Sequence, residues 1–269
     1  MAEARMPEEF FEELKPLLPP EQTVGPLGGR PPIGHGVVMK VIWFVLVTGC
    51  RWEDVPLELG CSGRTAHRRL QAWEALGLWE QLHRHLLTLL RKAGVLEAET
   101  VIVDSVIVRA FGGGDDTGPS PVDRRKPGTK HTLMVDRNGI PLAIQTAGAN
   151  ASDHTQILPI VLSYPRVGGT PGRPKELPEE VYADRGYDSD DTRGILLWLG
   201  ITPKIAERGT PHGSGLGKVR WVVERTISWI KGLRRMRIRY DRLKIMQHAW
   251  NSLAAAVVCF QIACFDCVV

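Results

Sequence analysis

The chain has 269 residues, of which 43% are hydrophobic and 24% charged, as in an ordinary globular protein of one or two domains. This composition excludes a largely disordered protein, and five widely spaced cysteines exclude a dense disulfide framework. The acidic, proline-containing start, together with apolar stretches shorter than the roughly 20 residues of a membrane span, predicts a cytoplasmic protein without a membrane anchor.

The first part of the chain is predicted to be helical. After a Gly/Pro-rich segment, residues 35–49 are apolar around the whole circumference of a helix, which predicts a central buried helix. Further helices are predicted over 54–59, 64–76 and 79–92. A short helix, a turn with glycine and a second, basic helix are typical of the helix-turn-helix, whose second helix enters the DNA major groove. A plain helical subdomain with an exposed basic face is the alternative. The candidate DNA-reading residues of the second helix are Arg64, Arg68 and Arg69.

Beyond about residue 98 the pattern changes to that of a mixed sheet. β-Branched residues predict a strand over 99–109, and two more strands, 130–136 and 141–147, flank Asn138-Gly139, a strong hairpin signal. Short strands and helices then alternate. The predicted strands are 180–183 and 202–205, and the predicted helices are 153–162, 189–199, 218–235 and 243–264. Three antiparallel strands followed by this alternation predict an α/β fold with helices on the faces of a mixed sheet.

Positive charge is concentrated late in the sequence. The net charge is only +4, yet the segment from Lys204 to Lys244 holds twelve basic and three acidic residues, and the remainder holds 22 basic and 27 acidic ones. Such asymmetry is typical of nucleic-acid binders, because Lys and Arg neutralise phosphates and release counterions. A solvated basic helix is the alternative interpretation.

Three carboxylates stand out on separate predicted elements. Asp104 interrupts the apolar strand VIVDSVIV, where a charge requires a partner or a metal. Asp184 ends the strand EVYA, at the edge where α/β sheets usually bind ligands. Glu224 lies on a basic helix in one stripe with Arg220 and Lys231, although an Arg–Glu pair four residues apart can also be purely structural. Carboxylates near cations suit Mg²⁺ ions that clamp the attacking and leaving oxygens of a phosphodiester.

Other candidate sites are weaker. His131, His154 and Asp153 lack the i, i+4 spacing of metal-binding histidines, so we expect structural or DNA-facing histidines. The tryptophans stand mostly at helical spacing among apolar residues, and we expect them in the core. Trp198 and Trp221 are included, although stacking on an extruded base is the alternative for these two.

Long stretches of the chain resemble bacterial insertion-sequence transposases of the Asp-Asp-Glu class, in particular the insertion-sequence-five family. GRPPIGHGVVMKVIWFVLVTGCRWEDVP and TAHRRLQAWEALGLWEQL resemble its DNA-binding domain. VIVDSVIVRA, GTKHTLMVDRNGIPLAIQTAGANASDH, YADRGYDSD and RWVVERTISWIKGLRRMRIRYDR resemble its catalytic domain. The family signature Tyr-x2-Arg-x3-Glu-x6-Lys is matched by Arg220, Glu224 and Lys231, while Gly217 stands at the tyrosine position.

The resemblance implies a helix-turn-helix-like DNA-binding domain over residues 1–95 and an RNase H-like α/β catalytic domain over 98–269. Asp104, Asp184 and Glu224 would bind catalytic Mg²⁺, for which Mn²⁺ substitutes. Because 80 residues separate Asp104 from Asp184 and 40 separate Asp184 from Glu224, no large insertion precedes the Glu helix. The catalytic-domain residues expected to contact DNA are Arg220, Lys231, Lys130 and Arg185.

The implied partners are double-stranded DNA, both terminal inverted repeats and target. Because two DNA ends must be brought together, the resemblance also implies a homodimer or larger assembly on DNA, in a nucleoid-associated cytoplasmic protein. Two alternatives belong to other functional classes. A DNA-binding regulator would need no acid in an apolar strand, which argues against it, whereas a nuclease without strand transfer would use the same metals and acids.

Overall fold

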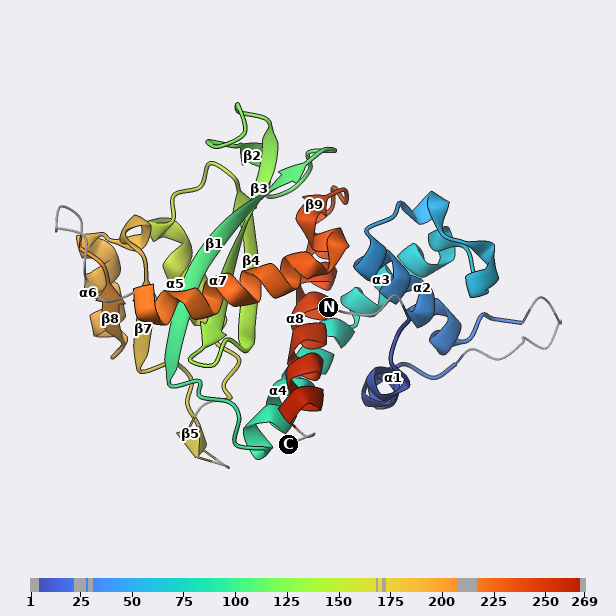
Figure 1. Ribbon diagram of the computed structural model, residues 1–269, viewed down its shortest axis with the longest axis horizontal. Helices are drawn as coiled ribbons and strands as arrows, with labels where there is room; N and C mark the ends of the chain where they lie inside the picture. The colour runs from blue at the N-terminus through green and yellow to red at the C-terminus, as the bar shows by residue number, and fades with distance from the viewer. Residues whose placement is uncertain are drawn as a thin grey trace.

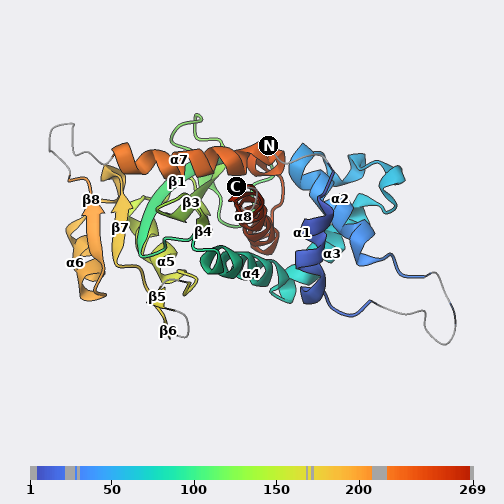
Figure 2. The same ribbon diagram turned by 60° about the horizontal axis from the view of Figure 1, so that its bottom comes forward.

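The computed structural model describes residues 5–21, 28, 31–167, 169–170, 173–207 and 217–266. A mixed sheet with helices on both faces occupies one half of the molecule, and the helices of the first 75 residues lie beside it (Figures 1 and 2). The predicted order, a helical part followed by an α/β part, is confirmed. None of the helices in these described ranges is long and apolar enough to cross a bilayer.

The main sheet is built around one long strand. Its strands are β1 (Thr100–Ala110), β2 (Gly118–Pro119), β3 (Pro127–Asp136), β4 (Pro141–Gly148), β7 (Glu180–Ala183), β8 (Thr202–Ile205) and β9 (Ile238–Arg239). The order across the sheet is β4-β3-β1-β7-β8, while β2 pairs with the start of β3 and β9 with the end of β1. β1, β3 and β4 are antiparallel, and β7 and β8 run parallel to β1. This is the mixed sheet that the sequence predicts. A separate ribbon pairs β5 (Gly169–Thr170) with β6 (Arg173–Pro174).

The predicted hairpin between β3 and β4 is confirmed and is held by a buried carboxylate. Gly139 has a φ of +88°, in the left-handed region that favours glycine. Asp136 Oδ1 accepts the backbone N–H groups of Asn138 and Ile140, and its Oδ2 accepts that of Glu97. Burial raises the pKa of this carboxyl to about 6, against the opposing effect of these N–H donors.

Helices cover the two faces of the sheet. Those around it are α4 (Leu78–Lys92), α5 (His154–Leu162), α6 (Asp190–Trp198), α7 (Gly217–Gly232) and α8 (Lys244–Asp266). Helix α7 crosses one face over β1 and β3, while α5 and α8 pack on the other face and α4 packs outside α8 (Figure 2). The predicted helices 153–162, 189–199 and 243–264 are therefore confirmed, and the helix predicted over 218–235 ends at Gly232, before a 3-10 turn at Arg234–Arg237.

The N-terminal helices are α1 (Glu8–Leu14), α2 (His35–Thr48) and α3 (Gly63–Ala75). α2 is buried along its length, as its apolar circumference predicts. The Ser62 side chain caps α3 by accepting the Thr65 N–H. The helix predicted over 54–59 is wrong, because two 3-10 turns, Trp52–Asp54 and Leu57–Leu59, stand there instead. Pro56 separates them, since proline donates no N–H and keeps the preceding residue extended.

One contiguous core joins the N-terminal helices to the sheet. α4 and α3 pack on α8, and the His83 side chain on α4 is hydrogen-bonded to the Pro141 carbonyl at the start of β4. The buried Arg235 binds Asp241 and the carbonyl of Cys50, so it links the C-terminal part to the loop after α2. The division into residues 1–95 and 98–269 stays a prediction.

The expectation that the tryptophans lie in the core is wrong for three of them. Trp198 is 84% exposed at the end of α6, where the helix presents its outer side to solvent. Trp221 and Trp229 are exposed on α7, with the Arg225 guanidinium 4.7 and 4.6 Å from their ring centroids. Because α7 packs on the sheet through Val222, Val223, Thr226 and Ile230, its opposite side stays outside. The buried tryptophans are Trp43, Trp52, Trp73, Trp79 and Trp250.

We expect the protein to lose stability in mild acid through His83. Burial lowers the pKa of this imidazole to about 4, and its Nε2 lies 2.7 Å from the Pro141 oxygen. The unfolded chain therefore binds the proton more tightly, and the stability present above the unfolded pKa is lost as the pH falls from 6.5 toward 4. The expected loss from this group is about 2 kcal/mol at pH 5. Chemical denaturation from pH 8 to pH 5 measures it. His83→Gln should flatten the profile, while an equal flattening in the partly exposed control His85→Gln would contradict this assignment.

Candidate active site

Two aspartates stand side by side on neighbouring parallel strands. β1 and β7 pair from Thr100 opposite Glu180 to Ile102 opposite Tyr182. The same register, continued by two residues, places Asp104 beside Asp184, just after β7 ends. Parallel pairing of a long strand with a short one therefore brings together two acids that are 80 residues apart in the sequence.

The local contacts fix both carboxylates. Asp104 Oδ1 accepts the backbone N–H of Ser105 at 2.8 Å, and Asp184 Oδ1 accepts that of Gly186 at 2.8 Å. Asp104 is largely buried, which raises its pKa, and the negative Asp184 raises it further. The Ser105 N–H and the Arg220 guanidinium oppose this shift. Two acids crowded in a poorly solvated place favour a cation between them.

A cationic side chain from α7 lies at that place. Arg220 Nη2 is 3.3 Å from Asp104 Oδ2 and 3.7 Å from Asp184 Oδ2. One atom of one residue thus contacts both carboxylates, and α7 is fixed over this edge of the sheet. Arg220, predicted to contact DNA, lies in direct contact with the predicted metal ligands.

Glu224 lies one helical turn beyond Arg220, and its side chain is exposed. Within the described ranges, no three acidic, histidine or cysteine side chains form a cluster that could hold a metal. The structure therefore brings Asp104 and Asp184 together with Arg220, and it places Glu224 near them without joining it to the pair.

The aspartate pair fits a hard divalent cation. The donors are carboxylate oxygens, which Mg²⁺ and Mn²⁺ prefer. The Oδ2 atoms of both residues already converge on one positively charged atom. Asp104 and Asp184 would hold the ion, and Glu224 is the next acid on the adjoining helix.

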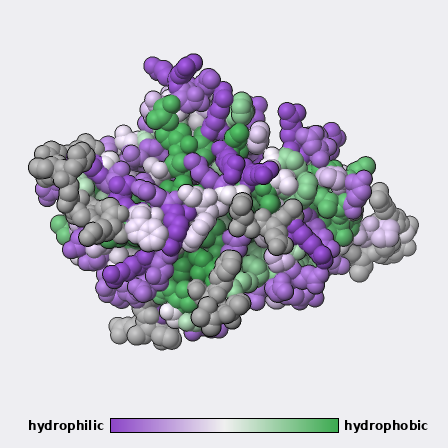
Figure 3. Space-filling view, in the orientation of Figure 1, coloured by the Kyte–Doolittle hydropathy of each residue, from purple (hydrophilic) through white to green (hydrophobic). Residues whose placement is uncertain are grey.

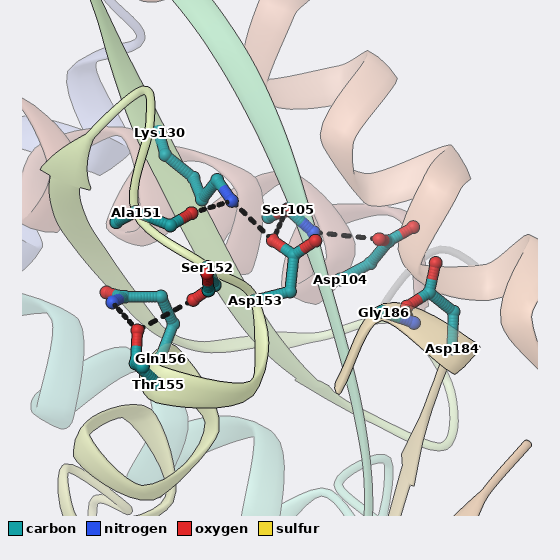
Figure 4. Close-up of polar contacts among 10 residues, drawn as sticks. All are labelled: Asp104, Ser105, Lys130, Ala151, Ser152, Asp153, Thr155, Gln156, Asp184 and Gly186. Carbon is teal, nitrogen blue, oxygen red and sulfur yellow. Dashed lines mark hydrogen bonds and ion pairs between the residues drawn. The ribbon is translucent and has the colours of Figure 1, made fainter. Parts of the chain in front are cut away.

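The sequence indicated a further acid, Asp153, only together with His131 and His154, as a weak candidate metal site. Asp153, just before α5, accepts hydrogen bonds from Ser105 Oγ and from Lys130 Nζ (Figure 4). Ser105 is the residue that follows Asp104 on β1. Lys130 is predicted to contact DNA, but its side chain is only 7% exposed and its ammonium also binds the Ala151 carbonyl. Because its side chain is buried and bound to Asp153 and Ala151, Lys130 makes contacts within the protein instead of presenting its charge to DNA.

The two neighbouring histidines are consistent with the expected structural role. His131 is buried, and burial lowers its pKa to about 4, with Arg239 and Lys231 acting in the same direction. His154 is half-buried at the start of α5, and its carbonyl accepts the Thr192 hydroxyl. Neither belongs to a metal-binding cluster among the residues that the structure describes.

The other predicted DNA contacts differ in exposure. Arg64 and Arg68 are exposed one turn apart on α3, whereas Arg69, on a different side of the helix, is half-buried. Arg185 and Lys231 are half-buried, close to Asp184 and at the end of α7 respectively. The tip of the loop between β2 and β3, at the top of Figure 3, is strongly hydrophilic. Its exposed basic residues, which the sequence did not indicate, are Arg124, Arg125 and Lys126.

A cavity of about 670 Å³ lies elsewhere, between α4, β4 and α8. Its lining includes none of the predicted site residues. The paired carboxylates of Asp104 and Asp184, not this cavity, therefore carry the chemistry that the residues suggest.

Comparison with known families identifies the class of enzyme. Residues 96–259 match the family described as "Transposase DDE domain", and residues 6–83 match the family described as "Putative transposase of IS4/5 family". The first match spans more than half of the chain, and it contains the two paired aspartates and Glu224. The chain belongs to this family of DDE transposases, which are enzymes that cleave and transfer DNA strands with divalent metal ions.

Similar proteins come from an insertion sequence. The chain is 49% identical over 148 residues to the "Putative transposase for insertion sequence element IS402" of Burkholderia cepacia, covering 55% of this chain and 70% of that protein. It is 40% identical over 129 residues to the "Insertion element IS402 uncharacterized 16.2 kDa protein" of the same organism, covering 47% of this chain and 88% of that protein. The predicted function, insertion-sequence transposase, is confirmed.

Solved structures show only a distant likeness. The catalytic core domain of BIV integrase is 14% identical, with a TM-score of 0.33, over 63% of this chain and 95% of that one. The Mos1 strand transfer complex is 12% identical, with a TM-score of 0.34, over 88% of this chain and 80% of that one.

Proposed function

We propose that this transposase binds the terminal inverted repeats of its element through residues 1–95 and cuts and rejoins DNA through residues 98–269. Asp104, Asp184 and Glu224 are the proposed ligands of Mg²⁺, with Mn²⁺ as a substitute. The observation that carries the proposal is the convergence of Asp104 and Asp184, from neighbouring parallel strands, on one nitrogen of Arg220.

The protein's own contribution is positioning. β1 and β7 hold the two aspartates with their Oδ2 atoms toward α7, and Glu224 is carried on that helix. When bound, Mg²⁺ supplies Lewis-acid activation of a water or 3′ hydroxyl and stabilises the departing 3′ oxygen. Arg220 is well placed to hold a scissile phosphate once it leaves the carboxylates, because guanidinium groups match phosphate geometry. Lys231 lies further along the same helix and suits a neighbouring phosphate.

Sequence recognition is proposed for the exposed side of α3. Arg64→Ala or Arg68→Ala should weaken binding to the element's end by about 1 to 3 kcal/mol if these side chains reach base edges. Binding to unrelated DNA should change much less. Fluorescence anisotropy with both duplexes measures the difference. Arg137→Ala, which removes an exposed arginine in the β3–β4 turn, is the matched control. Equal losses of binding free energy on both duplexes would show that Arg64 and Arg68 contact phosphates and not base edges.

The assembly that acts on DNA is proposed to be a homodimer or larger, since two element ends must meet. Light scattering of the protein with and without an end duplex measures this directly. Two protein chains and two duplexes in the complex would support paired ends, while a stable complex of one chain with one duplex during strand transfer would contradict them.

The test of the catalytic proposal is a cleavage assay on a labelled duplex carrying the element's end. We expect nicking at the end in Mg²⁺ or Mn²⁺ and none in EDTA. Specific binding without cleavage in either condition would favour a DNA-binding regulator. Cleavage at random positions would favour a general nuclease.

A further inference from the structure

A buried lysine holds Asp153 in place close to the catalytic aspartates. Lys130 Nζ donates to Asp153 Oδ1 at 2.5 Å and to the Ala151 carbonyl at 2.5 Å (Figure 4). With 7% of the Lys130 side chain exposed, its ammonium group depends on a nearby negative charge. Asp153 supplies that charge, so the position of its carboxylate is set by the long strand β3.

Ser105 connects this ion pair to Asp104. Its Oγ donates to Asp153 Oδ1 at 3.2 Å, and its backbone N–H donates to Asp104 Oδ1 at 2.8 Å. Because successive side chains of a strand point to opposite faces, Asp104 faces α7 while Ser105 faces the start of α5. The ion pair therefore supports β1 from the face opposite the predicted metal site, at the residue that fixes the Asp104 carboxylate.

Asp153 also approaches Asp184, across a glycine. A Cβ atom on Gly186 would lie 2.9 Å from Asp153 Oδ2 and 2.9 Å from Asp184 Oδ1. Both distances are shorter than real Cβ contacts, so a side chain at this position would push these carboxylate oxygens out of their present positions. The same Gly186 donates its N–H to Asp184 Oδ1. Asp153 thus contacts Ser105, which binds Asp104, and lies beside Gly186, which binds Asp184.

We infer that Asp153, Lys130 and Ser105 form a positioning unit that holds Asp104 and Asp184 in their metal-binding orientation. This inference rests on the proposed function, because it assumes that the two aspartates bind the divalent ion. Partners that hydrogen-bond and orient metal ligands commonly contribute about 10- to 100-fold to metal affinity or activity. A purely structural ion pair would instead affect stability and leave metal affinity unchanged.

Ser105→Ala gives the sharpest test, because it removes the connecting hydroxyl and keeps the Lys130–Asp153 pair. Mn²⁺ titration of the protein by electron paramagnetic resonance gives a dissociation constant that does not depend on turnover. We expect it to rise by about 10-fold or more, with a parallel fall in cleavage rate and unchanged binding to the end duplex. Ser105→Thr restores a hydroxyl and should recover most of the affinity. Ser152→Ala, which removes an exposed hydroxyl from the adjacent loop, is the matched control.

Asp153→Asn should show the same loss of Mn²⁺ affinity. Because this change leaves Lys130 without its counter-charge, the double variant Lys130→Met/Asp153→Asn is measured beside it. The positioning role is overturned if Ser105→Ala and the folded Asp153 variant bind Mn²⁺ as tightly as the unaltered protein. A protein that binds no Mn²⁺ even without substitutions would overturn the proposed metal site itself, so the two failures are distinguishable.

Discussion

Asp184→Asn is expected to lower the rate of strand cleavage by at least about 10³-fold and to leave binding of the element's end nearly unchanged. Asparagine has the same shape but no charge, so a metal ligand loses several kcal/mol of transition-state stabilisation, at about 1.4 kcal/mol for each factor of ten. Asp104→Asn should behave alike, because both side chains converge on the same cationic position. Single-turnover cleavage and anisotropy measure the two quantities separately.

Glu224→Gln tests whether the exposed glutamate joins the aspartate pair when DNA and metal bind. We expect a loss of the same order as for Asp184→Asn. Asp191→Asn is the matched control, because Asp191 is an exposed acid in the first turn of α6, seven residues beyond Asp184. Loss of activity in Asp191→Asn equal to that in Asp184→Asn, or loss of end binding in every variant, would argue against the proposed catalytic set.

The second large effect is expected at a buried ion pair far from the chemistry. Arg235 is 4% exposed, and its Nη2 lies 2.8 Å from Asp241 Oδ2, which also accepts the Trp250 indole N–H. Asp241→Asn leaves the guanidinium buried without its counter-charge. We expect the free energy of unfolding to fall by about 3 to 5 kcal/mol, which urea denaturation measures.

The exposed pair between Arg84 and Glu80, at 2.6 Å, is the matched control. Glu80→Gln should cost less than about 1 kcal/mol, because solvent screens an exposed pair. The double variant Arg235→Met/Asp241→Leu removes both charges and should recover part of the loss. A loss below about 1 kcal/mol for Asp241→Asn would show that this buried ion pair contributes little to the stability of the fold.

Local signals predicted most of the elements that position the site. Neighbouring residues define three of these elements: the β-branched run of β1, the Asn138-Gly139 turn and the four-residue strand β7. Each of them lies close to its predicted bounds. Asp104 and Asp184 could be found for the same reason. One is a charge inside an apolar strand, and the other follows a strand end. Their pairing then depends on the parallel register between β1 and β7.

The network behind the aspartates could not be predicted in this way. Lys130 resembles any exposed cation in the sequence, and its burial depends on Asp153, 23 residues away, reaching the same face of the sheet. Arg235 likewise looks like one more basic residue of a DNA-binding segment until Asp241 and Trp52 enclose it. Pairings between distant residues are set by how the elements pack, and no local pattern of residues encodes them.

The most direct test of strand transfer supplies pre-cut element ends with free 3′ hydroxyls, together with a supercoiled target plasmid, in Mg²⁺. The account predicts covalently joined products with the unaltered protein and none with Asp184→Asn or in EDTA. Hydrolysis of the target without joined products, or joining that persists in Asp184→Asn, would contradict it.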